Sequence, residues 1–355
     1  MKKIPLIIYS ILLLPFNPMA KENVFKHTKE KVIEGVIWGL DFISEDEVLL
    51  TQREGGLYKY HLKTKKLDKI KHTLDVYSEG QGGLLDVLID SDSGRKKTIY
   101  LTYAKKLSNN RMTTALYKGE LNGDTLSGVD IFVAKTASDK GEHFGSRVVK
   151  KGKALFMSIG ERGKRHEAQK LSNHHGVIVR LNLDGSAHKE NPFKDSPYIF
   201  TYGHRNPQGL AVHQDSQELY EAEFGPRGGD ELNIIKKGKN YGWPVITYGS
   251  EYWGPKIGET AKEGMEQPLK YWTPSISPSG LAIYSGKLFK AWKGNFFLAN
   301  LSSQHLRRLV IKDNKVVEEE ELLKGMQERM RVVKEAPNGE ILIGTDSGLL
   351  ITLKK

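Results

Sequence analysis

Six weakly similar segments follow one another along this chain of 355 residues. Each has a glycine and an apolar strand, a polar turn and a second apolar strand, often followed by another glycine and a third strand. Turns such as Asn-Gly, Asp-Gly and Ser-Gly separate the apolar runs, and this pattern is typical of β-hairpins. The segments span residues 39–62, 82–121, 143–185, 203–244, 277–311 and 329–355.

Repeats of this kind predict an all-β fold, a six-bladed β-propeller with four-stranded antiparallel blades around a central channel. A radial arrangement lets every sheet bury both faces against its neighbours. Two β-sandwiches are the alternative, although sandwiches do not require a recurring turn-and-glycine pattern. The last segment has room for three strands only. We therefore expect a strand near the N-terminus, around residues 31–37, to complete the last blade and close the ring.

The first residues have the layout of a secretory signal. Lys2 and Lys3 precede an apolar run at residues 4–16, which leads into Pro-Met-Ala at 18–20. This predicts a signal peptide at 1–20 and a single propeller domain at 21–355, located in the periplasm or secreted. The apolar run is shorter than the roughly 20 residues that span a bilayer, so we expect no integral membrane segment.

Composition and missing motifs exclude several classes of protein. The chain has no cysteine, which excludes disulfides and thiolate metal sites. The net charge is +11, but the lysines are scattered through predicted turns without a basic helix, so we expect no nucleic acid partner. A Gly-x-Ser-x-Gly elbow, a phosphate loop and a Rossmann fingerprint are absent from the sequence, which disfavours serine hydrolases and nucleotide enzymes.

Polar residues recur at one position of the repeats, the start of the predicted innermost strand. Side chains at equivalent positions of a propeller converge on the channel, where loops of several blades build ligand sites. A histidine there is suited to accept a proton near neutral pH, and arginines are suited to hold carboxylates. The alternative is that these are structural side chains and surface ion pairs. The residues are Gln81, His143, Arg205, Asn206, Arg329 and Arg331.

The segment 223–233, EFGPRGGDELN, combines glycines with acidic residues. Asp230, Glu231 and the carbonyls of a Gly-Pro kink are hard oxygen ligands that suit Ca²⁺, whereas the alternative is a simple turn. His174 and His175 are adjacent, but no third ligand follows at zinc spacing. We interpret this pair as structural.

Several strings match one known family in order and spacing. The chain resembles the soluble pyrroloquinoline quinone (PQQ)-dependent aldose sugar dehydrogenases, the glucose and sorbosone dehydrogenases, over nearly all of residues 21–355. The resemblance implies a quinoprotein that oxidises aldose sugars at the anomeric carbon to the lactone. The matching strings are GQGGLLD (80–86), HFGSR (143–147), YGHRNPQGLA (202–211), GPRGGDELN (225–233), GKNYGWP (238–244) and RMR (329–331).

The resemblance also implies a role for each matching residue. His143 stands at the catalytic base, which takes the proton of the anomeric hydroxyl while hydride passes to the quinone. The carbonyls of Gly225 and Pro226 match the loop holding the calcium that polarises the quinone. Glu231 and the carbonyl of Tyr241 match a second, structural calcium site. The expected PQQ contacts are Gln81, Arg205, Asn206, Arg329 and Arg331.

The sequence departs from the glucose-oxidising members of the family at several positions. They carry an aspartate before the base and a lysine on the fifth blade, where this chain has Glu142 and Ser302 with Ser303. Val332 stands where an acid usually follows the arginines, and Phe224 replaces a polar residue.

Two other functions stay open beside the sugar dehydrogenase. One is a non-catalytic calcium-binding propeller, a ligand- or partner-binding module that no longer loads the quinone. The other is a calcium-dependent lactonase, which needs several carboxylate or amide ligands on its metal. The expected partners are an aldose substrate and an electron acceptor that the sequence does not identify, and the chain is expected to be a monomer or homodimer.

Overall fold

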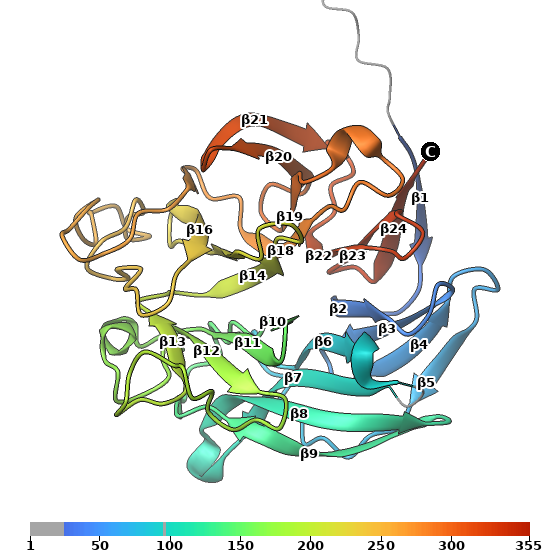
Figure 1. The fold of residues 1–355 in the computed structure, drawn as a ribbon, viewed down its shortest axis with the longest axis horizontal. Helices are drawn as coiled ribbons and strands as arrows, with labels where there is room; N and C mark the ends of the chain where they lie inside the picture. Colours follow the sequence, from blue (N-terminus) through green and yellow to red (C-terminus); the bar gives the residue numbers. More distant parts are fainter. Residues whose placement is uncertain (1–24, 95–96) are drawn as a thin grey trace, which may run out of the picture.

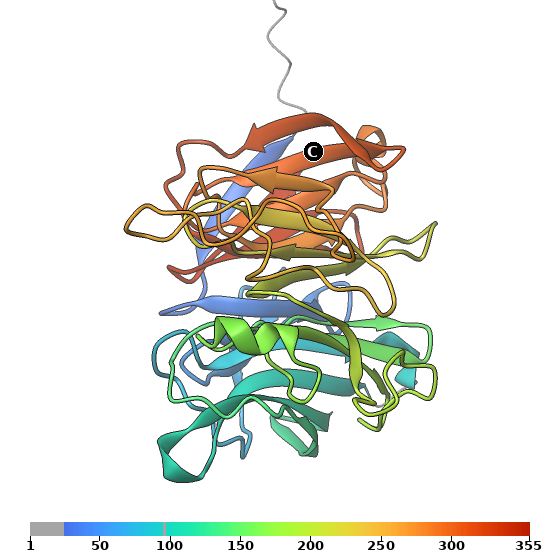
Figure 2. The same cartoon turned by 90° about the vertical axis from the view of Figure 1, so that its left-hand side faces the viewer.

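The computed structural model describes residues 25–94 and 97–355, which form six four-stranded antiparallel sheets. The sheets are arranged as blades around a common centre (Figure 1), and the same ring is seen from the side in Figure 2. The prediction of a six-bladed β-propeller is therefore confirmed. The predicted signal peptide at 1–20 lies outside the described residues.

In blades 1 to 5 the strands are antiparallel neighbours in sequence order, running outward from the strand nearest the centre, and in blade 6 the N-terminal strand takes the outermost place (Figure 1). Blade 1 contains β2 (Ile37–Phe42), β3 (Glu47–Gln52), β4 (Leu57–His61) and β5 (Leu67–Ile70). Blade 2 contains β6 (Leu84–Asp90), β7 (Thr98–Lys106), β8 (Met112–Asn122) and β9 (Thr125–Val133). Blade 3 contains β10 (Val148–Lys151), β11 (Ala154–Ile159), β12 (Val177–Asn182) and β13 (Ile199–Tyr202).

The other blades repeat this order, and short 3₁₀ turns lie between strands. Blade 4 contains β14 (Pro207–Val212), β15 (Leu219–Glu223), β16 (Asp230–Ile235) and β17 (Lys270–Trp272). Blade 5 contains β18 (Pro278–Ile283), β19 (Phe296–Asn300), β20 (Leu306–Lys312) and β21 (Lys315–Leu322). Blade 6 contains β22 (Met330–Glu335), β23 (Ile341–Thr345), β24 (Leu349–Lys354) and β1 (Lys26–Lys31). The 3₁₀ turns are η1 (Ser91–Ser93), η2 (Ser108–Asn110), η3 (Arg165–Gln169) and η4 (Lys290–Trp292).

Strand β1 closes the ring by pairing with β24, from Lys26 opposite Lys354 to Lys31 opposite Leu349. Closure by an N-terminal strand is confirmed, but its expected position around residues 31–37 is wrong. The sequence of β1, KHTKEK, lies largely exposed and carries no apolar pattern. The apolar Ile33, within the expected range, is not part of a strand. Its side chain packs in an apolar cluster between blades 6 and 1.

Apolar clusters fill the spaces between adjacent blades. Leu155 and Val179 of blade 3 pack against Leu116 of blade 2, for example, and all three are fully buried. Burying one such side chain contributes about 1.5–3 kcal/mol. This packing on both faces explains why apolar residues do not simply alternate with polar ones in the inner strands, as in the fully buried β6, LLDVLID.

Five of the six innermost strands carry an irregularity near their first residues. In β2, β14, β18 and β22 one residue is skipped in the pairing with the next strand, and in β6 two residues are skipped. A β-bulge of this type leaves the extra residue outside the ladder, so its carbonyl needs another partner. The skipped residues are Trp38, Leu85, Asp86, Gln208, Ser279 and Arg331.

Candidate functional site

A cavity of about 260 Å³, here called the site cavity, lies where the innermost strands begin. Residues of all six blades or of the loops before them line it. The structure thus brings together side chains that the sequence placed at one position of the repeat, and adds the Gly-Pro kink of blade 4. The predicted site residues that line it are Gln81, His143, Arg205, Asn206, Gly225, Pro226, Arg329 and Arg331.

His143 lies in the loop before β10, and both its backbone N–H and its backbone carbonyl are in close contact with neighbouring residues. Its backbone is in the left-handed region, with φ 54°, and its N–H donates to Gln81 Oε1 at 2.9 Å. A Cβ at Gly160 would lie 2.0 Å from the His143 carbonyl oxygen, so only glycine allows this approach. Strained backbone at a non-glycine residue persists only where the surroundings enforce it. The loop therefore fixes the backbone of His143.

The imidazole of His143 is bonded to a carboxylate behind it. Nδ1 contacts Glu161 Oε1, and Glu161 is only 2% exposed. Because an ionised carboxylate only accepts, Nδ1 carries the hydrogen and Nε2 keeps a lone pair. Burial and the charge of Arg205 lower the pKa of His143 below its ordinary 6.5, although Glu161 opposes this. His143 is thus a neutral proton acceptor at neutral pH.

Glu161 was missed by the sequence reasoning. It follows β11 within the string SIGERG and belongs to no periodic pattern. Its backbone N–H donates to the Arg205 carbonyl at 2.8 Å, which ties it to blade 4. Its own carbonyl accepts from His175 Nδ1 at 2.9 Å, so His175 is structural, as interpreted.

Two of the cavity arginines share one carboxylate. Asp346 accepts from Arg329 Nε at 2.8 Å, and from Arg331 Nε and Nη2 at 2.8 and 3.0 Å. Burial opposes ionisation of Asp346, but the two arginines hold its pKa below the usual range. Asp346, in the turn after β23, was missed by the sequence reasoning. The sequence has Val332 where an acid was expected, and this valine is buried between blades. The carboxylate beside the arginines comes from Asp346.

Arg205 lies beside the Gly-Pro kink of blade 4. Its Nη1 donates to the carbonyls of Phe224 and Gly225 at 3.1 and 2.8 Å. The neighbouring Asn206 accepts from the Gly145 N–H at 3.1 Å, which joins it to the loop of His143. The predicted PQQ contacts therefore also organise the protein around the cavity.

A fourth arginine lines the cavity and was not predicted. Arg53, in the turn after β3, contributes a guanidinium there, 3.1 Å from Glu54. Ser302, at the position where the glucose-oxidising members were expected to have a lysine, donates to the Ser275 carbonyl at 3.0 Å. It is not among the residues lining this cavity. Four guanidinium groups against Asp346 leave a cationic lining, which suits an anionic ligand with carboxylates.

Asp230 organises the kink through hydrogen bonds to backbone N–H groups. Its Oδ1 accepts from the Gly225 N–H at 2.7 Å, and its Oδ2 from the N–H groups of Ile276 and Ser277 at 2.6 and 2.7 Å. A Cβ on Gly225 would lie 2.2 Å from the Gly228 carbonyl oxygen, so the kink requires glycine.

A second, much smaller void lies behind the kink. Glu231 and Tyr241 line it together with Glu223, and its volume of about 10 Å³ holds a single water or ion. Burial and the Glu223 carboxylate raise the pKa of Glu231 to about 8.

Further carboxylates surround this void. Glu221 and Glu223 on β15 lie opposite Asn233 and Glu231 on β16. Glu221 is fully buried, and no described residue bonds to its Oε1 or to Asn233 Oδ1. Ligand atoms of His204, Glu221 and Glu223 lie within 4.8 Å of one another. Buried carboxylates this close repel one another unless they are protonated or neutralised by a cation.

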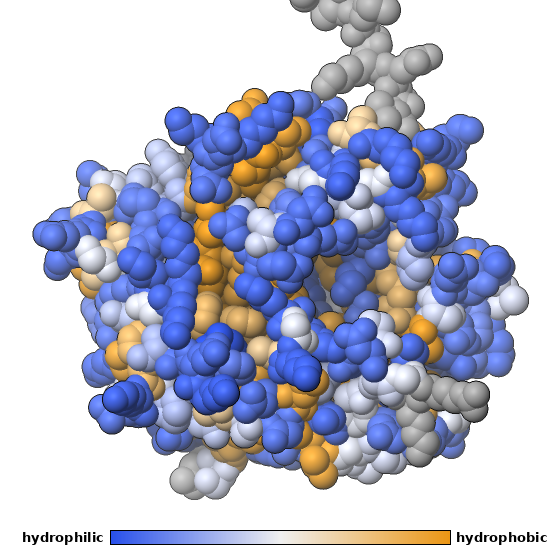
Figure 3. Space-filling model, in the orientation of Figure 1, coloured by the Kyte–Doolittle hydropathy of each residue, from blue (hydrophilic) through white to orange (hydrophobic). Residues whose placement is uncertain are grey.

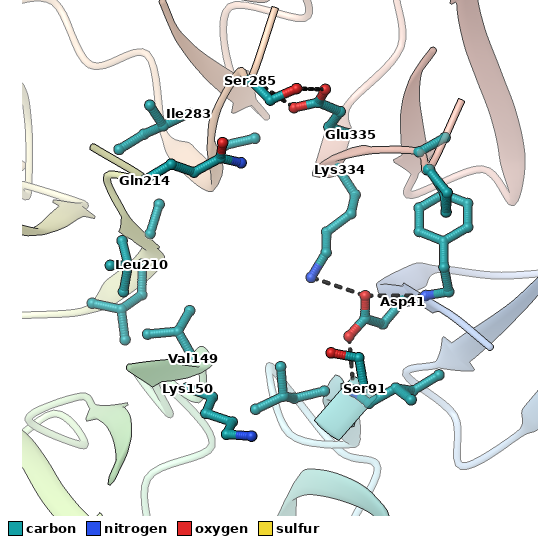
Figure 4. A pocket seen from close by; sticks show the side chains of 18 of the residues that line it. Asp41, Ser91, Val149, Lys150, Leu210, Gln214, Ile283, Ser285, Lys334 and Glu335 are labelled. Atoms are coloured by element: carbon teal, nitrogen blue, oxygen red, sulfur yellow. Dashed lines mark hydrogen bonds and ion pairs between the residues drawn. The ribbon is translucent and has the colours of Figure 1, made fainter. Parts of the chain in front are cut away.

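Another cavity, here called the far cavity, lies where the innermost strands end. Its volume is about 730 Å³, and apolar residues such as Val149, Leu210 and Ile283 point into it (Figure 4). Its charged groups are paired, for example Lys334 with Asp41 at 3.0 Å. Apolar residues also gather around a hollow near the middle of the face in Figure 3, inside a largely hydrophilic rim. The predicted site residues are not among those lining the far cavity.

The fold and the site define a class: a six-bladed propeller whose axial cavity combines a proton acceptor with a cationic lining. The sequence profile described as Glucose / Sorbosone dehydrogenase matches residues 35–352, so the chain belongs to this family. The protein is an oxidoreductase acting on sugars.

Individual relatives agree with this assignment. The chain is 37% identical over 321 residues to aldose sugar dehydrogenase YliI of Escherichia coli K12, which covers 87% of this chain and 86% of that protein. The crystal structure of the soluble aldose sugar dehydrogenase of E. coli in the apo-form has a TM-score of 0.88 at 34% identity, covering 93% and 99% of the two chains. The PQQ-bound aldose sugar dehydrogenase of Streptomyces coelicolor has a TM-score of 0.77 at 25% identity, covering 93% and 98%.

Proposed function

We propose that this protein oxidises aldose sugars at the anomeric carbon to the lactone, using bound PQQ. The observation that carries the proposal is His143, whose imidazole is held by Glu161 while the residue lines a cavity with four guanidinium groups. A proton acceptor and a binding site for a carboxylated ligand in one cavity are what this reaction requires. The lactonase and the non-catalytic propeller gain no comparable observation.

In this proposal His143 accepts the proton of the anomeric hydroxyl at Nε2. The carboxylate of Glu161 keeps Nδ1 protonated and stabilises the imidazolium that forms. Gln81 holds the backbone of His143, and the contact of Nδ1 with Glu161 orients the ring. The low pKa of His143 keeps it unprotonated before each turnover.

The cavity residues fit PQQ by charge and by hydrogen-bonding chemistry. When bound, the quinone supplies the acceptor for the hydride of the sugar. Arg205, Arg329 and Arg331 would hold its carboxylates as charge-assisted pairs, and Gln81 and Asn206 would add polar contacts.

We also propose two calcium sites. The carbonyls of Gly225 and Pro226 would hold one ion beside the quinone, because the kink already exposes the Gly225 carbonyl to a cation, the Arg205 guanidinium. Glu231 and the Tyr241 carbonyl would hold the structural ion in the small void, with Glu221 and Glu223 adding charge.

We infer that residues 1–20 are a cleaved signal peptide, that 21–355 form a single propeller domain, and that the protein works in the periplasm or is secreted. In the part of the chain that the structure describes, no helix is both long and apolar enough to cross a membrane. Sequencing the N-terminus of the protein recovered from a periplasmic fraction tests this, since an intact Met1 would contradict it.

The experiment that tests the proposed function adds PQQ and Ca²⁺ to the purified protein and records the absorbance spectrum with a panel of aldoses. Reduction of the bound quinone by a sugar, lost in His143→Ala, is the expected result. A folded protein that binds no quinone at micromolar concentration with calcium present would overturn the proposal.

A further inference from the structure

Arg147 lies at the centre of the ring and donates hydrogen bonds to each of the other five blades. It comes directly before β10 of blade 3 and is only 4% exposed. A guanidinium group has five N–H donors, and each of them has an acceptor here, one from each of the other five blades. The acceptors are Gln208 O for Nε at 2.7 Å, Trp38 O and Asp86 Oδ1 for Nη1 at 3.3 and 2.8 Å, and Ser279 O and Arg331 O for Nη2 at 2.7 and 3.0 Å.

The β-bulges of the innermost strands supply these acceptors. Trp38, Gln208, Ser279 and Arg331 are the residues skipped in the pairing of β2, β14, β18 and β22. A skipped residue leaves its carbonyl outside the ladder, and at these four positions the carbonyl accepts from Arg147. The bulges and the guanidinium therefore form one structure, in which, among the described contacts, only the Arg331 carbonyl has a second donor, Ser279 Oγ at 2.8 Å.

The charge of Arg147 is compensated inside the ring. Asp86 pairs with it at 2.8 Å, and the other carboxylate oxygen of Asp86 accepts from the Val148 N–H at 3.0 Å. The ring of Trp38 lies under the guanidinium, 4.1 Å from its central carbon. A buried charge with this many partners is costly to remove, because each partner is then left unsatisfied.

Arg147 is also directly connected to the side chains of the site cavity. The backbone carbonyls of Gln208 and Arg331 accept from it, and Arg331 Nη1 donates to Gln208 Oε1 at 3.2 Å. Arg147 itself is not among the residues lining either cavity. The site cavity is lined by Trp38, Gln208 and Arg331, and the far cavity by the later residues of the same strands.

We propose that Arg147 is a positioning residue that couples the six blades, sets the place of Arg331 in the site cavity and closes the channel between the two cavities. The part concerning Arg331 rests on the proposed function, because it concerns the binding of the quinone. Arg147 acts through other residues and touches neither sugar nor quinone.

The test compares Arg147→Lys with Leu342→Ala in the full chain. Lysine keeps the charge and the stem but has three donors for five acceptors. Leu342 is a fully buried residue of β23 between blades 6 and 1, so its truncation is a destabilised control away from the channel. Hydrogen exchange of the quinone-free proteins is measured by peptide mass, and quinone affinity is measured by titration with PQQ and Ca²⁺.

We expect Arg147→Lys to speed exchange in β2, β6, β14, β18 and β22, whereas Leu342→Ala speeds it in blades 6 and 1 only. Quinone affinity should fall about 10- to 100-fold in Arg147→Lys and less than about twofold in the control, because small displacements of binding groups are costly. Faster exchange confined to blade 3, or equal affinity loss in both variants, would overturn the inference.

Two further outcomes are distinguishable. If wild-type protein binds no quinone, the proposed function fails together with the role toward Arg331, while hydrogen exchange still decides whether Arg147 couples the blades. If Arg147→Lys does not fold, Asp86→Asn replaces it, since this variant keeps the guanidinium but removes its paired charge. The same exchange pattern is expected, and its confinement to blade 2 would count against the inference.

Discussion

Glu161 holds the imidazole of His143 from the side opposite its free nitrogen. The carboxylate comes from the turn after β11 and the histidine from the loop before β10, so one blade supplies both members of the pair. This arrangement leads to the first prediction. Glu161→Gln should lower kcat/KM about 10- to 100-fold, because a hydrogen bond to a charged group contributes about 1.5–3 kcal/mol.

The control for this variant is Glu142→Gln. Glu142 also favours the protonated form of His143 electrostatically, but no hydrogen bond joins the two side chains among the described contacts. Its replacement should change kcat/KM by less than about threefold, since Glu142 is only partly buried and acts on His143 through its charge alone. Equal losses in both variants would show that charge, not orientation, explains the effect.

The second prediction concerns the protonation of His143. Burial and Arg205 lower its pKa, so in the quinone-free protein His143 should titrate below 6.5 and be neutral at pH 7. The lowered pKa means that the proton leaves at lower pH than from a free histidine. Proton NMR of the imidazole signals measures this, with the His143→Gln spectrum as assignment. A titration midpoint above 6.5 would contradict the prediction.

The third prediction concerns Arg329, whose side chain is 49% exposed. Arg329→Gln should weaken quinone binding about 10- to 100-fold, the value of one charge-assisted hydrogen bond, and leave the thermal midpoint nearly unchanged. Lys63→Gln is the matched control, because Lys63 also pairs with an aspartate and lies 78% exposed on an outer turn. A loss of similar size in the control would mean that only net charge matters.

The fourth prediction concerns the buried carboxylates. With calcium at about 100 times its Kd, wild-type protein should gain about 2.7 kcal/mol in the free energy of unfolding relative to protein in chelator. Glu221→Gln should lose most of this gain but be more stable than wild type in chelator, because a neutral amide relieves the repulsion from Glu223. Glu218→Gln, directly before β15, should behave as wild type. An unchanged calcium gain in Glu221→Gln would exclude Glu221 from the site.

The innermost strands could be predicted from the sequence, whereas most outer strands could not. An inner strand such as β6, LLDVLID, is buried on both faces and has apolar residues at five of its seven positions. The outermost strand β21, KVVEEEEL, is mostly polar, and β17 has only three residues. Such strands are held by pairing with one neighbour and need no apolar pattern of their own. The first five segments therefore ended one strand too early.

The same reasoning separates the predicted from the missed residues of the site. His143 and the arginines could be found because they share a position in the repeat. Glu161, Asp346 and Arg53 also share a position, the turn after the second strand of their blades, but they differ in residue type, and the sequence reasoning considered only the starts of the innermost strands. Their roles depend on distances across the ring, which the sequence does not contain.

The closed channel at Arg147 has a kinetic consequence for any chemistry in the site cavity. A propeller with an open axis could take up a molecule at one end and release another at the opposite end. Here the guanidinium and its five acceptors block that route, so substrate and product enter and leave the site cavity through the same opening. A product still in the cavity then blocks entry of the next substrate until it has left.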